Sequence, residues 1–248
     1  MATYACTDLH SQYTLYKKIK AFLQPEDKVI FLGDAGDRGT DTSWKLIKTI
    51  LSDPQFIYLK GNHEDMLYRA MYDYIKYEEV GSDYHLLCHN GGYYTFQGWL
   101  DEDEKFQGNW MRLIRDLPYF HIYKNQTGKT IILSHAGYTP QYDYEHNTFT
   151  IPEDEYVTLW SRNHFNDTWD RNLPTCVVVH GHTPKEHLEE RLSPWNDSEV
   201  RPGAYWYCDN HKVCLDCGSA YTGETVLLNL DTFEEHIFVD ENNEDIDF

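Results

Sequence analysis

"FLGDAGDRGT", residues 31–40, places two aspartates and an arginine among three glycines, directly behind an apolar run. The run "KVIFLGD" at 28–34 has the apolar core of a buried strand. Charged side chains this close to a hydrophobic strand are costly unless something pairs with them. The glycines allow the backbone to turn sharply where the strand ends. The stretch therefore predicts a strand followed by a tight loop that presents Asp34, Asp37 and Arg38 to a ligand or a partner.

Similar units recur on both sides of this stretch. Strand-like runs that end in polar residues and glycine are "FIYLKGN" (56–62), "TIILSHAG" (130–137), "TCVVVHGH" (175–182) and "VCLDCG" (213–218). Amphipathic stretches of helical period lie between the early runs, at 11–23 and 41–52. This alternation predicts βαβ units with parallel strands, and hence an α/β domain.

Polar side chains gather at the expected carboxyl ends of these strands. They are Asp8, His10, Asp34, Asn62, His63, Glu64, His135, His180 and His182. In open α/β sheets, binding sites form beyond these strand ends. Carboxylates and imidazoles suit divalent metals such as Mn, Fe or Zn, and there are more candidate ligands than one tetrahedral ion can use. The pattern favours a two-metal centre, which would clamp a phosphoryl group and lower the pKa of a bound water.

Composition limits the classes of partner. The chain has 248 residues and a formal net charge of -20, which argues against sequence-independent nucleic-acid binding. An anionic substrate must then be held by local positive charge, because the overall field repels it. No run approaches the ~20 apolar residues of a membrane span. The N-terminus has neither the basic nor the apolar part of a secretory signal, so we expect a cytoplasmic protein with no membrane partner.

The order of the motifs resembles that of a known family. "DLH" (8–10), "GDAGDRG" (33–39), "GNHE" (61–64), "HAG" (135–137) and "HGHT" (180–183) follow one another. They resemble the metal-dependent phosphoesterases of the calcineurin-like superfamily, and more narrowly the small bacterial and phage members of its phosphoprotein phosphatase branch. The segments "HNGGYYTF" (89–96), "LWSRN" (159–163) and "DCGSAYTGE" (216–224) agree with it. The resemblance covers the chain from Asp8 to about Glu224.

The resemblance implies an α/β fold of two packed mixed β-sheets flanked by helices, the four-layer sandwich of metallophosphoesterases. We expect one domain over residues 1–238 and an acidic C-terminal tail over 239–248. Two divalent metal ions are implied, with manganese expected first and iron or zinc as the other candidates. By position, Asp8 and His10 would hold the first ion and Asp34 would bridge both. The second would be held by Asn62, His135 and His182.

The remaining roles follow from the same resemblance. Arg38 and Arg162 match phosphate-binding arginines, whose planar guanidinium forks onto two phosphate oxygens. His63 matches a general acid that protonates the leaving oxygen, and Asp37 the carboxylate that orients and charges it. Asn62 is also expected to contact the substrate. Tyr221, in "AYTGE" (220–224), matches a substrate-side position beside the metals, although a packed aromatic residue is an equally good interpretation.

The implied function is hydrolysis of phosphomonoesters by direct attack of a metal-bridging hydroxide. The substrate would be a phosphoprotein, in a serine/threonine protein phosphatase, or a small phosphorylated molecule. A bis(5'-nucleosyl)-tetraphosphatase, which hydrolyses diadenosine tetraphosphate, shares these motifs and is the alternative enzyme. An inactive metal-binding scaffold is a further alternative, but it would not need Asp37, Arg38 and His63.

Two groups of residues have a simpler interpretation. His180 is expected to be a strand-end histidine outside the ligand set, and Glu64 a carboxylate at a helix N-terminus. "CDNHKVCLDC" (208–217) could bind zinc through four residues, but a hairpin that turns at 209–212 explains the segment better. The four candidate zinc ligands are Cys208, His211, Cys214 and Cys217.

Overall fold

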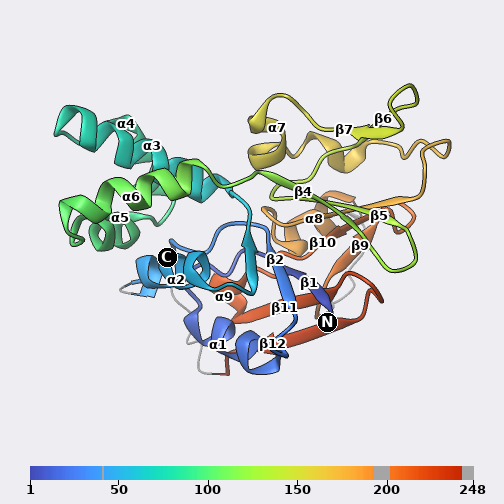
Figure 1. The fold of residues 1–248 in the computed structure, drawn as a ribbon, viewed down its shortest axis with the longest axis horizontal. Coiled ribbons are helices and arrows are strands. Elements are labelled where there is room, and N and C mark those ends of the chain that lie inside the picture. The colour runs from blue at the N-terminus through green and yellow to red at the C-terminus, as the bar shows by residue number, and fades with distance from the viewer. Residues whose placement is uncertain (41, 193–201, 242–248) are drawn as a thin grey trace.

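The computed structural model describes residues 1–40, 42–192 and 202–241, and two five-stranded sheets form its centre (Figure 1). The first sheet has the order β12-β11-β1-β2-β3 and the second has the order β4-β5-β8-β10-β9. The first contains β1 (Thr3–Cys6), β2 (Lys28–Phe31), β3 (Phe56–Tyr58), β11 (Glu224–Asn229) and β12 (Glu235–Val239). The second contains β4 (Phe120–Lys124), β5 (Thr130–Ser134), β8 (Cys176–His180), β9 (Tyr205–Tyr207) and β10 (Lys212–Cys214).

Both sheets are mixed, as expected. β1, β2 and β3 run parallel to one another, and so do β5, β8 and β10. β4, β9 and β11 pair antiparallel to β5, β10 and β1, and β12 pairs antiparallel to β11. The observed strands end several residues earlier than the apolar runs suggest, because the glycines and polar residues that follow leave the sheet as loops. The loops that follow the six parallel strands therefore lie at the carboxyl-end edges of the two sheets.

The two sheets pack face to face through an apolar layer. Alternate residues of a strand point to opposite faces, so Ala5 and Ile30 face the other sheet while Cys6 and Phe31 face the helices. The inter-sheet layer also contains Leu133, Val179 and Val226 and is fully buried. Parallel strands covered on both faces explain the continuous apolar runs of the sequence.

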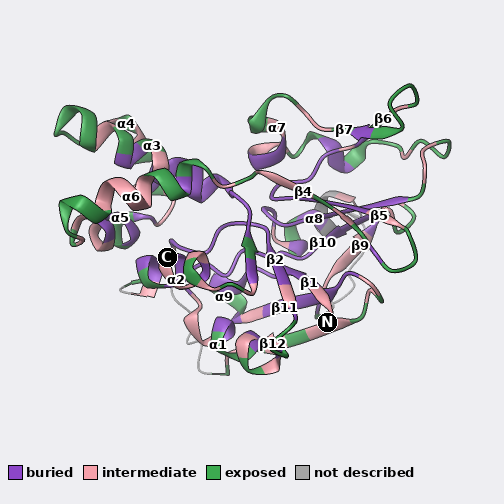
Figure 2. Cartoon of the chain, in the orientation of Figure 1, coloured by how far each residue is buried: buried purple, intermediate pink, exposed green. Residues whose placement is uncertain are grey.

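Helices cover the outer face of the first sheet. α1 (Tyr13–Phe22) and α2 (Thr42–Ser52) are the crossover connections predicted from the sequence. Four further helices form a lobe between β3 and β4: α3 (Asn62–Tyr77), α4 (Ser82–His89), α5 (Tyr93–Leu100) and α6 (Glu104–Arg115) (Figure 1). The buried residues of α3 lie in the part of the helix from Asn62 to Met71, whereas the far ends of the lobe are exposed (Figure 2).

Residues 138–174, which contain few long apolar runs, cover the second sheet. They form a small hairpin, β6 (Gln141–Asp143) with β7 (Thr148–Thr150), then α7 (Glu155–Trp160) and the short 3-10 helix η1 (Asn163–Asn166). Tyr138 and Phe149 pack against Ile132 and Val178 of the sheet. α8 (Lys185–Leu192) and α9 (Ser219–Thr222) complete the fold.

The segment with four candidate zinc ligands is a hairpin. β9 pairs antiparallel with β10, and Lys212 lies opposite Tyr207. The candidate ligands point to different places: the thiols of Cys214 and Cys217 bond to the carbonyls of Thr183 and Gly203, and His211 contacts the carbonyl of Cys176. No cysteine belongs to a metal-type cluster within the described residues.

The end of the chain is described only in part. Strand β12 extends to Val239, so the first residue of the expected tail belongs to the sheet. Residues 242–248 of that tail lie outside the described residues. Across the described ranges, no helix combines the length and apolarity that crossing a membrane requires.

Candidate active site

All six residues predicted to bind metal meet at one end of the two sheets. Asp8 and His10 follow β1, Asp34 follows β2, and Asn62 begins α3 directly after the loop that leaves β3. From the second sheet, His135 follows β5 and His182 follows β8. Each of the six side chains is buried, although all carry polar or charged groups. The first sheet thus supplies four of the predicted ligands and the second supplies two.

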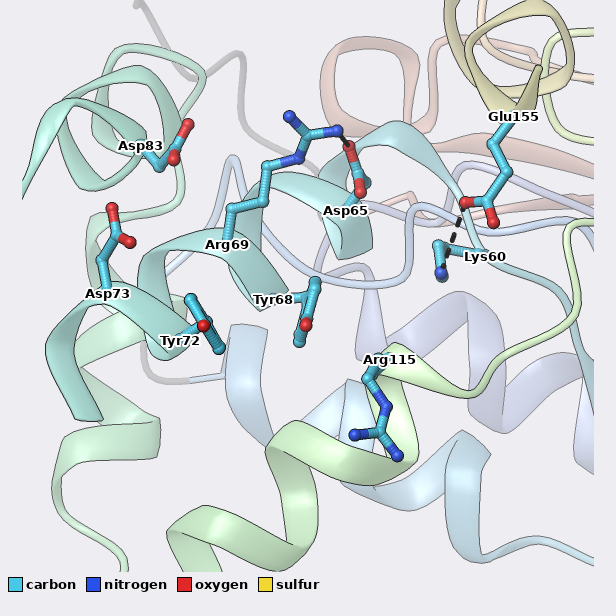
Figure 3. Close-up of a pocket in the computed structure, with 9 residues that line it drawn as sticks. All are labelled: Lys60, Asp65, Tyr68, Arg69, Tyr72, Asp73, Asp83, Arg115 and Glu155. Atoms are coloured by element: carbon cyan, nitrogen blue, oxygen red, sulfur yellow. Dashed lines mark ion pairs between the residues drawn. The ribbon is translucent and has the colours of Figure 1, made fainter. Parts of the chain in front are cut away.

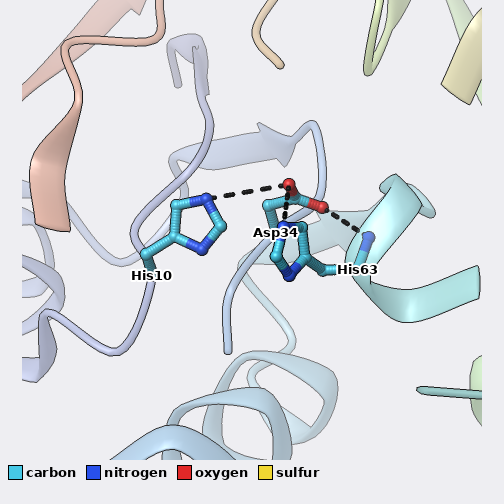
Figure 4. A group of neighbouring side chains, drawn as sticks. All are labelled: His10, Asp34 and His63. Carbon is cyan, nitrogen blue, oxygen red and sulfur yellow. Dashed lines mark hydrogen bonds and ion pairs between the residues drawn. The ribbon is translucent and has the colours of Figure 1, made fainter. Parts of the chain in front are cut away.

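Asp34 lies at the centre of this arrangement. Its Oδ2 atom is 3.7 Å from His10 Nε2, 3.8 Å from His63 Nε2 and 3.3 Å from His135 Nε2. Figure 4 shows the imidazoles of His10 and His63 beside this carboxylate. Two groups of metal-type donors share it, one with His10 and His63 and one with Asp8 and His135; the donor atoms within each group lie within 4.8 Å of one another. A carboxylate common to both groups suits the predicted bridging position.

The imidazoles are oriented by backbone carbonyls. His10 Nδ1 lies 3.0 Å from the Gly36 carbonyl, and His135 Nδ1 lies 2.9 Å from the Leu32 carbonyl. His182 Nε2 contacts the Trp160 carbonyl at 3.2 Å. The other nitrogens of His135 and His182 point at Asn62 Oδ1, at 2.7 and 2.8 Å. A carbonyl on one ring nitrogen with the other nitrogen directed inward is typical of metal-binding histidine.

The charge balance of the centre also fits bound cations. The ion-pair partners of the buried carboxylates Asp8 and Asp34 in the described part of the chain are all histidines. Burial, together with the charge of Asp216, raises the pKa of Asp8. Burial opposes ionisation of Asp34 as well, but His135 and His63 lower its pKa. Oxygen and imidazole donors without a thiolate suit divalent first-row metals. The residues present therefore fit a pair of such ions.

The backbone at this site is strained. Asp8, His10, Asp34 and His182 have φ values of 50°, 40°, 60° and 68°, in the left-handed region that non-glycine residues avoid. Each such residue costs about 1–2 kcal/mol and persists only where its surroundings enforce it. Ser11, Asp37 and Arg38 share this conformation, and so do residues in turns elsewhere in the described chain. The loops that carry the predicted ligands are therefore held by their surroundings in a conformation that the residues avoid on their own.

Glu64 is one of the groups that enforce this backbone. Its carboxylate accepts the backbone N–H groups of Asp34, Ala35 and Gly61 at 2.8, 3.1 and 2.9 Å, and the Tyr58 hydroxyl at 2.6 Å. It is the carboxylate of a helix N-terminus, as predicted, but it also holds the loop after β2. That loop packs backbone to backbone: a Cβ at Gly33, where φ is 100°, would lie 2.4 Å from the Gly61 nitrogen.

His63 and Asp37 form the pair that the sequence predicts. His63 Nδ1 lies 2.6 Å from Asp37 Oδ2, and both side chains are buried. Burial alone would lower the pKa of His63, but Asp34 and Asp37 raise it above the ordinary value. Thr95 of α5, which sequence reasoning missed, donates its hydroxyl to the other oxygen of Asp37 and accepts the Asp37 N–H at 3.1 Å. The signal for Thr95 was its place in "HNGGYYTF".

The two arginines approach the centre from different loops. The backbone N–H of Arg38 donates to the Gly91 carbonyl at 3.0 Å, and its guanidinium lies over the Tyr221 ring at 5.8 Å. Arg162 Nε donates to Thr183 Oγ1 at 2.9 Å, and its Nη2 donates to the His182 carbonyl at 3.4 Å. Tyr221 is 47% exposed, so it belongs to the rim of the site.

Both ring nitrogens of His180, which is not a predicted ligand, contact protein groups away from the six predicted ligands. Its Nε2 faces the Tyr207 hydroxyl at 2.8 Å, and its Nδ1 lies 3.0 Å from the Gly181 carbonyl. Burial lowers its pKa to about 3.

A cavity of about 510 Å³ lies between α3 and α7 (Figure 3). One face of α3 lines the cavity with Asp65, Arg69 and Asp73. These residues follow Asn62 by three, seven and eleven positions, so they lie on the same face of the helix as that predicted ligand. At the other side, α7 ends at Trp160, which contacts His182. None of the residues that line the cavity belongs to the predicted metal, catalytic or phosphate-binding set. Its remaining lining residues are Lys60, Tyr68, Tyr72, Asp83, Arg115 and Glu155.

The cations of the cavity have carboxylate partners. Lys60 lies 3.7 Å from Glu155, and Arg69 lies 3.0 Å from Asp65. Arg115 pairs with the adjacent Asp116 at 2.7 Å.

Fold and site together define a metallophosphoesterase, with buried carboxylates and imidazoles at the joint edge of two packed mixed sheets. Residues 1–216 match the model of the calcineurin-like phosphoesterases, and the chain belongs to that family. Its members are usually dinuclear metal hydrolases. A search of curated proteins found no match.

Solved structures confirm the fold at low sequence identity. A protein described as a candidate diadenosine tetraphosphatase is 15% identical with a TM-score of 0.56, covering 97% of this chain and 94% of that one. A protein serine/threonine phosphatase from Saccharomyces cerevisiae, described as similar to human phosphatase PP5, is 15% identical with a TM-score of 0.52 and coverage of 99% and 82%. A cold-active protein tyrosine phosphatase is 16% identical with a TM-score of 0.52 and coverage of 98% and 80%.

Proposed function

We propose that this chain is a phosphoprotein phosphatase that hydrolyses phosphoserine and phosphothreonine with two divalent ions, manganese first among them. The observation that carries the proposal is the buried His63–Asp37 pair, directed at a centre that two arginines flank. A protein that only binds metal has no use for a proton donor or for a phosphate clamp. The substrate class and the narrower phosphoprotein phosphatase branch are both parts of this proposal.

Divalent ions bound by Asp8, His10, Asp34, Asn62, His135 and His182 would neutralise phosphoryl charge and lower the pKa of a water. The other residues would bind the substrate. Arg38 and Arg162 reach the centre from separate loops, so their guanidinium groups would hold the phosphoryl oxygens from two sides. Local positive charge matters here because the chain as a whole carries a formal charge of -20.

His63 would supply the proton for the leaving oxygen. Its Nδ1 is occupied by Asp37, and its Nε2 faces the centre, 3.8 Å from Asp34 Oδ2. The Asp37 carboxylate favours the charged imidazole and fixes the ring, so that Nε2 carries a hydrogen toward the substrate. Thr95 holds Asp37 in turn. This chain of contacts suits general acid catalysis, in which a positioned donor protonates a poor leaving group.

The charges around the centre favour a monoester over a dinucleoside polyphosphate. Two arginines suit one phosphoryl group, whereas a tetraphosphate needs further cations along its length. The cavity along α3 offers Lys60, Arg69 and Arg115, but each has a carboxylate partner. With Tyr68 and Tyr72 also in its lining, the cavity suits the uncharged or mixed-charge flank of a peptide.

The test compares kcat/KM on a phosphoserine peptide, a phosphotyrosine peptide and diadenosine tetraphosphate, each with added Mn²⁺. We expect the phosphoserine peptide to exceed the dinucleotide by about tenfold or more, a gap of about 1.4 kcal/mol in transition-state stabilisation. The reverse order would support the tetraphosphatase named among the similar structures. No turnover on any of them, or on p-nitrophenyl phosphate, would support the inactive scaffold.

A further inference from the structure

Lys212 of β10 is a fully buried lysine that the chemistry above does not use. Its Nζ atom donates to Thr139 Oγ1 and to the His164 carbonyl, each at 2.8 Å, and lies 3.4 Å from His164 Nδ1. Within the described ranges no carboxylate is at ion-pair distance from it. Burial lowers its pKa to about 8, although Cys208 and Asp167 act in the opposite direction. Burying an ammonium among neutral groups alone is costly. We therefore ask which parts of the structure its hydrogen bonds to Thr139 and His164 hold in place.

The partners of Lys212 lie on two loops that carry predicted site residues. His164 belongs to η1, which begins directly after Arg162. Thr139 lies four residues after His135 in the loop that follows β5. His164 also joins the two loops itself, because its Nε2 donates to the Ala136 carbonyl at 2.8 Å. Lys212 and His164 therefore tie the segment that bears Arg162 to the loop that bears His135.

This junction has little room to move. A Cβ at Gly137, where φ is 74°, would lie 3.1 Å from the His164 ring and 2.9 Å from the His180 ring. The other end of η1 is also held, because Thr139 Oγ1 donates to Asp167 Oδ2 at 2.7 Å. The ammonium of Lys212 thus binds one partner inside η1 and one that holds the end of η1.

From this geometry we infer that Lys212 is a positioning residue for phosphate binding that acts through Arg162; the inference rests on the phosphatase function proposed above. The backbone of Arg162 is fixed by the clamped η1, and its guanidinium is aimed by Thr183 and the His182 carbonyl. Without the ammonium, the His164 carbonyl and Thr139 lose a donor and η1 can shift. A displacement of about 1 Å at a positioning group can cost on the order of 10²-fold in rate.

A double-mutant cycle separates this role from general stability. The affinity of the Mn²⁺-loaded protein for inorganic phosphate is measured by calorimetry for wild type, Lys212→Met, Arg162→Ala and the double variant. Lys212→Met is expected to weaken phosphate binding about 5–20-fold when Arg162 is present and to change nothing when it is absent. An equal loss in both backgrounds, or no loss in either, would overturn the inference.

Two further variants keep the test decisive. If Lys212→Met does not fold, Thr139→Val takes its place, because it removes the hydroxyl that accepts from the ammonium and donates to Asp167. It should weaken phosphate binding about 2–5-fold, again only with Arg162 present. A folded Thr139→Val variant that binds phosphate normally would contradict the inference. Asp53→Asn breaks an ion pair with Lys20 outside the site and should lower stability without weakening phosphate binding. A wild type that binds phosphate but hydrolyses no ester would refute the proposed function and leave this inference standing.

Discussion

His63→Asn removes the proposed proton donor and leaves the backbone of the centre intact. The contact between His63 and Asp34 Oδ1 is made by the backbone N–H, at 3.1 Å, and survives the substitution. The substitution removes the imidazole, and with it the 2.6 Å contact between His63 Nδ1 and Asp37 Oδ2. We therefore expect a variant that folds, still takes up metal and fails where the leaving oxygen needs a proton.

The size of the loss should depend on the leaving group. General acid catalysis typically contributes ~10²–10⁴-fold, which is about 2.7–5.4 kcal/mol of barrier at 1.36 kcal/mol for each factor of ten. A serine alkoxide is strongly basic and should show the full loss. p-Nitrophenolate is stable without a proton, so its release should slow by less than about tenfold. Asp37→Asn keeps the imidazole and leaves Asp34, but it removes the second carboxylate that raises the pKa of His63, so it should show the same bias more mildly.

The assay is kcat/KM for wild type, His63→Asn and Asp37→Asn on a phosphoserine peptide and on p-nitrophenyl phosphate. Metal content is measured for each protein, so that loss of ions is not mistaken for loss of a proton donor. Thr95→Val is the matched control, since Thr95 bonds to the far oxygen of Asp37 and has no contact with the imidazole. It should have the smallest effect of the series.

An equal loss on both substrates would refute the reasoning. His63 would then act by positioning, which its place beside His10 and Asp34 in one donor group would allow.

Three other results are expected. Arg162→Ala should raise KM and lower kcat for phosphomonoesters without loss of metal, because Arg162 is not among the predicted ligands and its Nη2 meets His182 at the backbone carbonyl. Steady-state kinetics with metal analysis will check this, and unchanged kinetics would leave phosphate binding to Arg38. Removal of metal with a chelator should abolish turnover and Mn²⁺ should restore it best, while an Asp34→Asn variant that kept both ions and the wild-type rate would contradict the bridging position. Asp53→Asn should lower the free energy of unfolding by about 1–2 kcal/mol at neutral pH in urea titrations. Burial opposes ionisation of Asp53, but Lys20, Gln55 and Tyr16 lower its pKa. The stabilisation that the Asp53 carboxylate provides is therefore present above the ordinary carboxylate pKa and is lost as the pH falls through the lowered value. Wild type and variant should then be equally stable in strong acid, and a difference in unfolding free energy that persists there would disprove the assignment.

The parallel strands and the residues at their ends could be predicted from the sequence, because each apolar run stops at glycine and a polar group of distinctive type. Asp34, His135 and His182 were found in this way. Short amphipathic helices such as α4 and α5 carry a weak pattern, since their aromatic residues are spread over several faces and many stay exposed. Thr95 and Lys212 owe their importance to partners 58 and 48 residues away, which no local pattern encodes.

The division of the donor groups between the two sheets sets an order of assembly. His10, Asp34 and His63 follow β1, β2 and β3 within the first 63 residues, so the donor group that they form can gather once these three strands pair. The other donor group, Asp8, Asp34 and His135, waits for the second sheet. So does the predicted ligand His182, whose backbone N–H donates to Asp8 across 174 residues of chain. During synthesis, then, the centre is completed only after the second sheet has docked on the first. A chain interrupted before residue 135 would carry four of the six predicted ligands and one complete donor group. Metal uptake at the whole site would then belong to the last stage of folding.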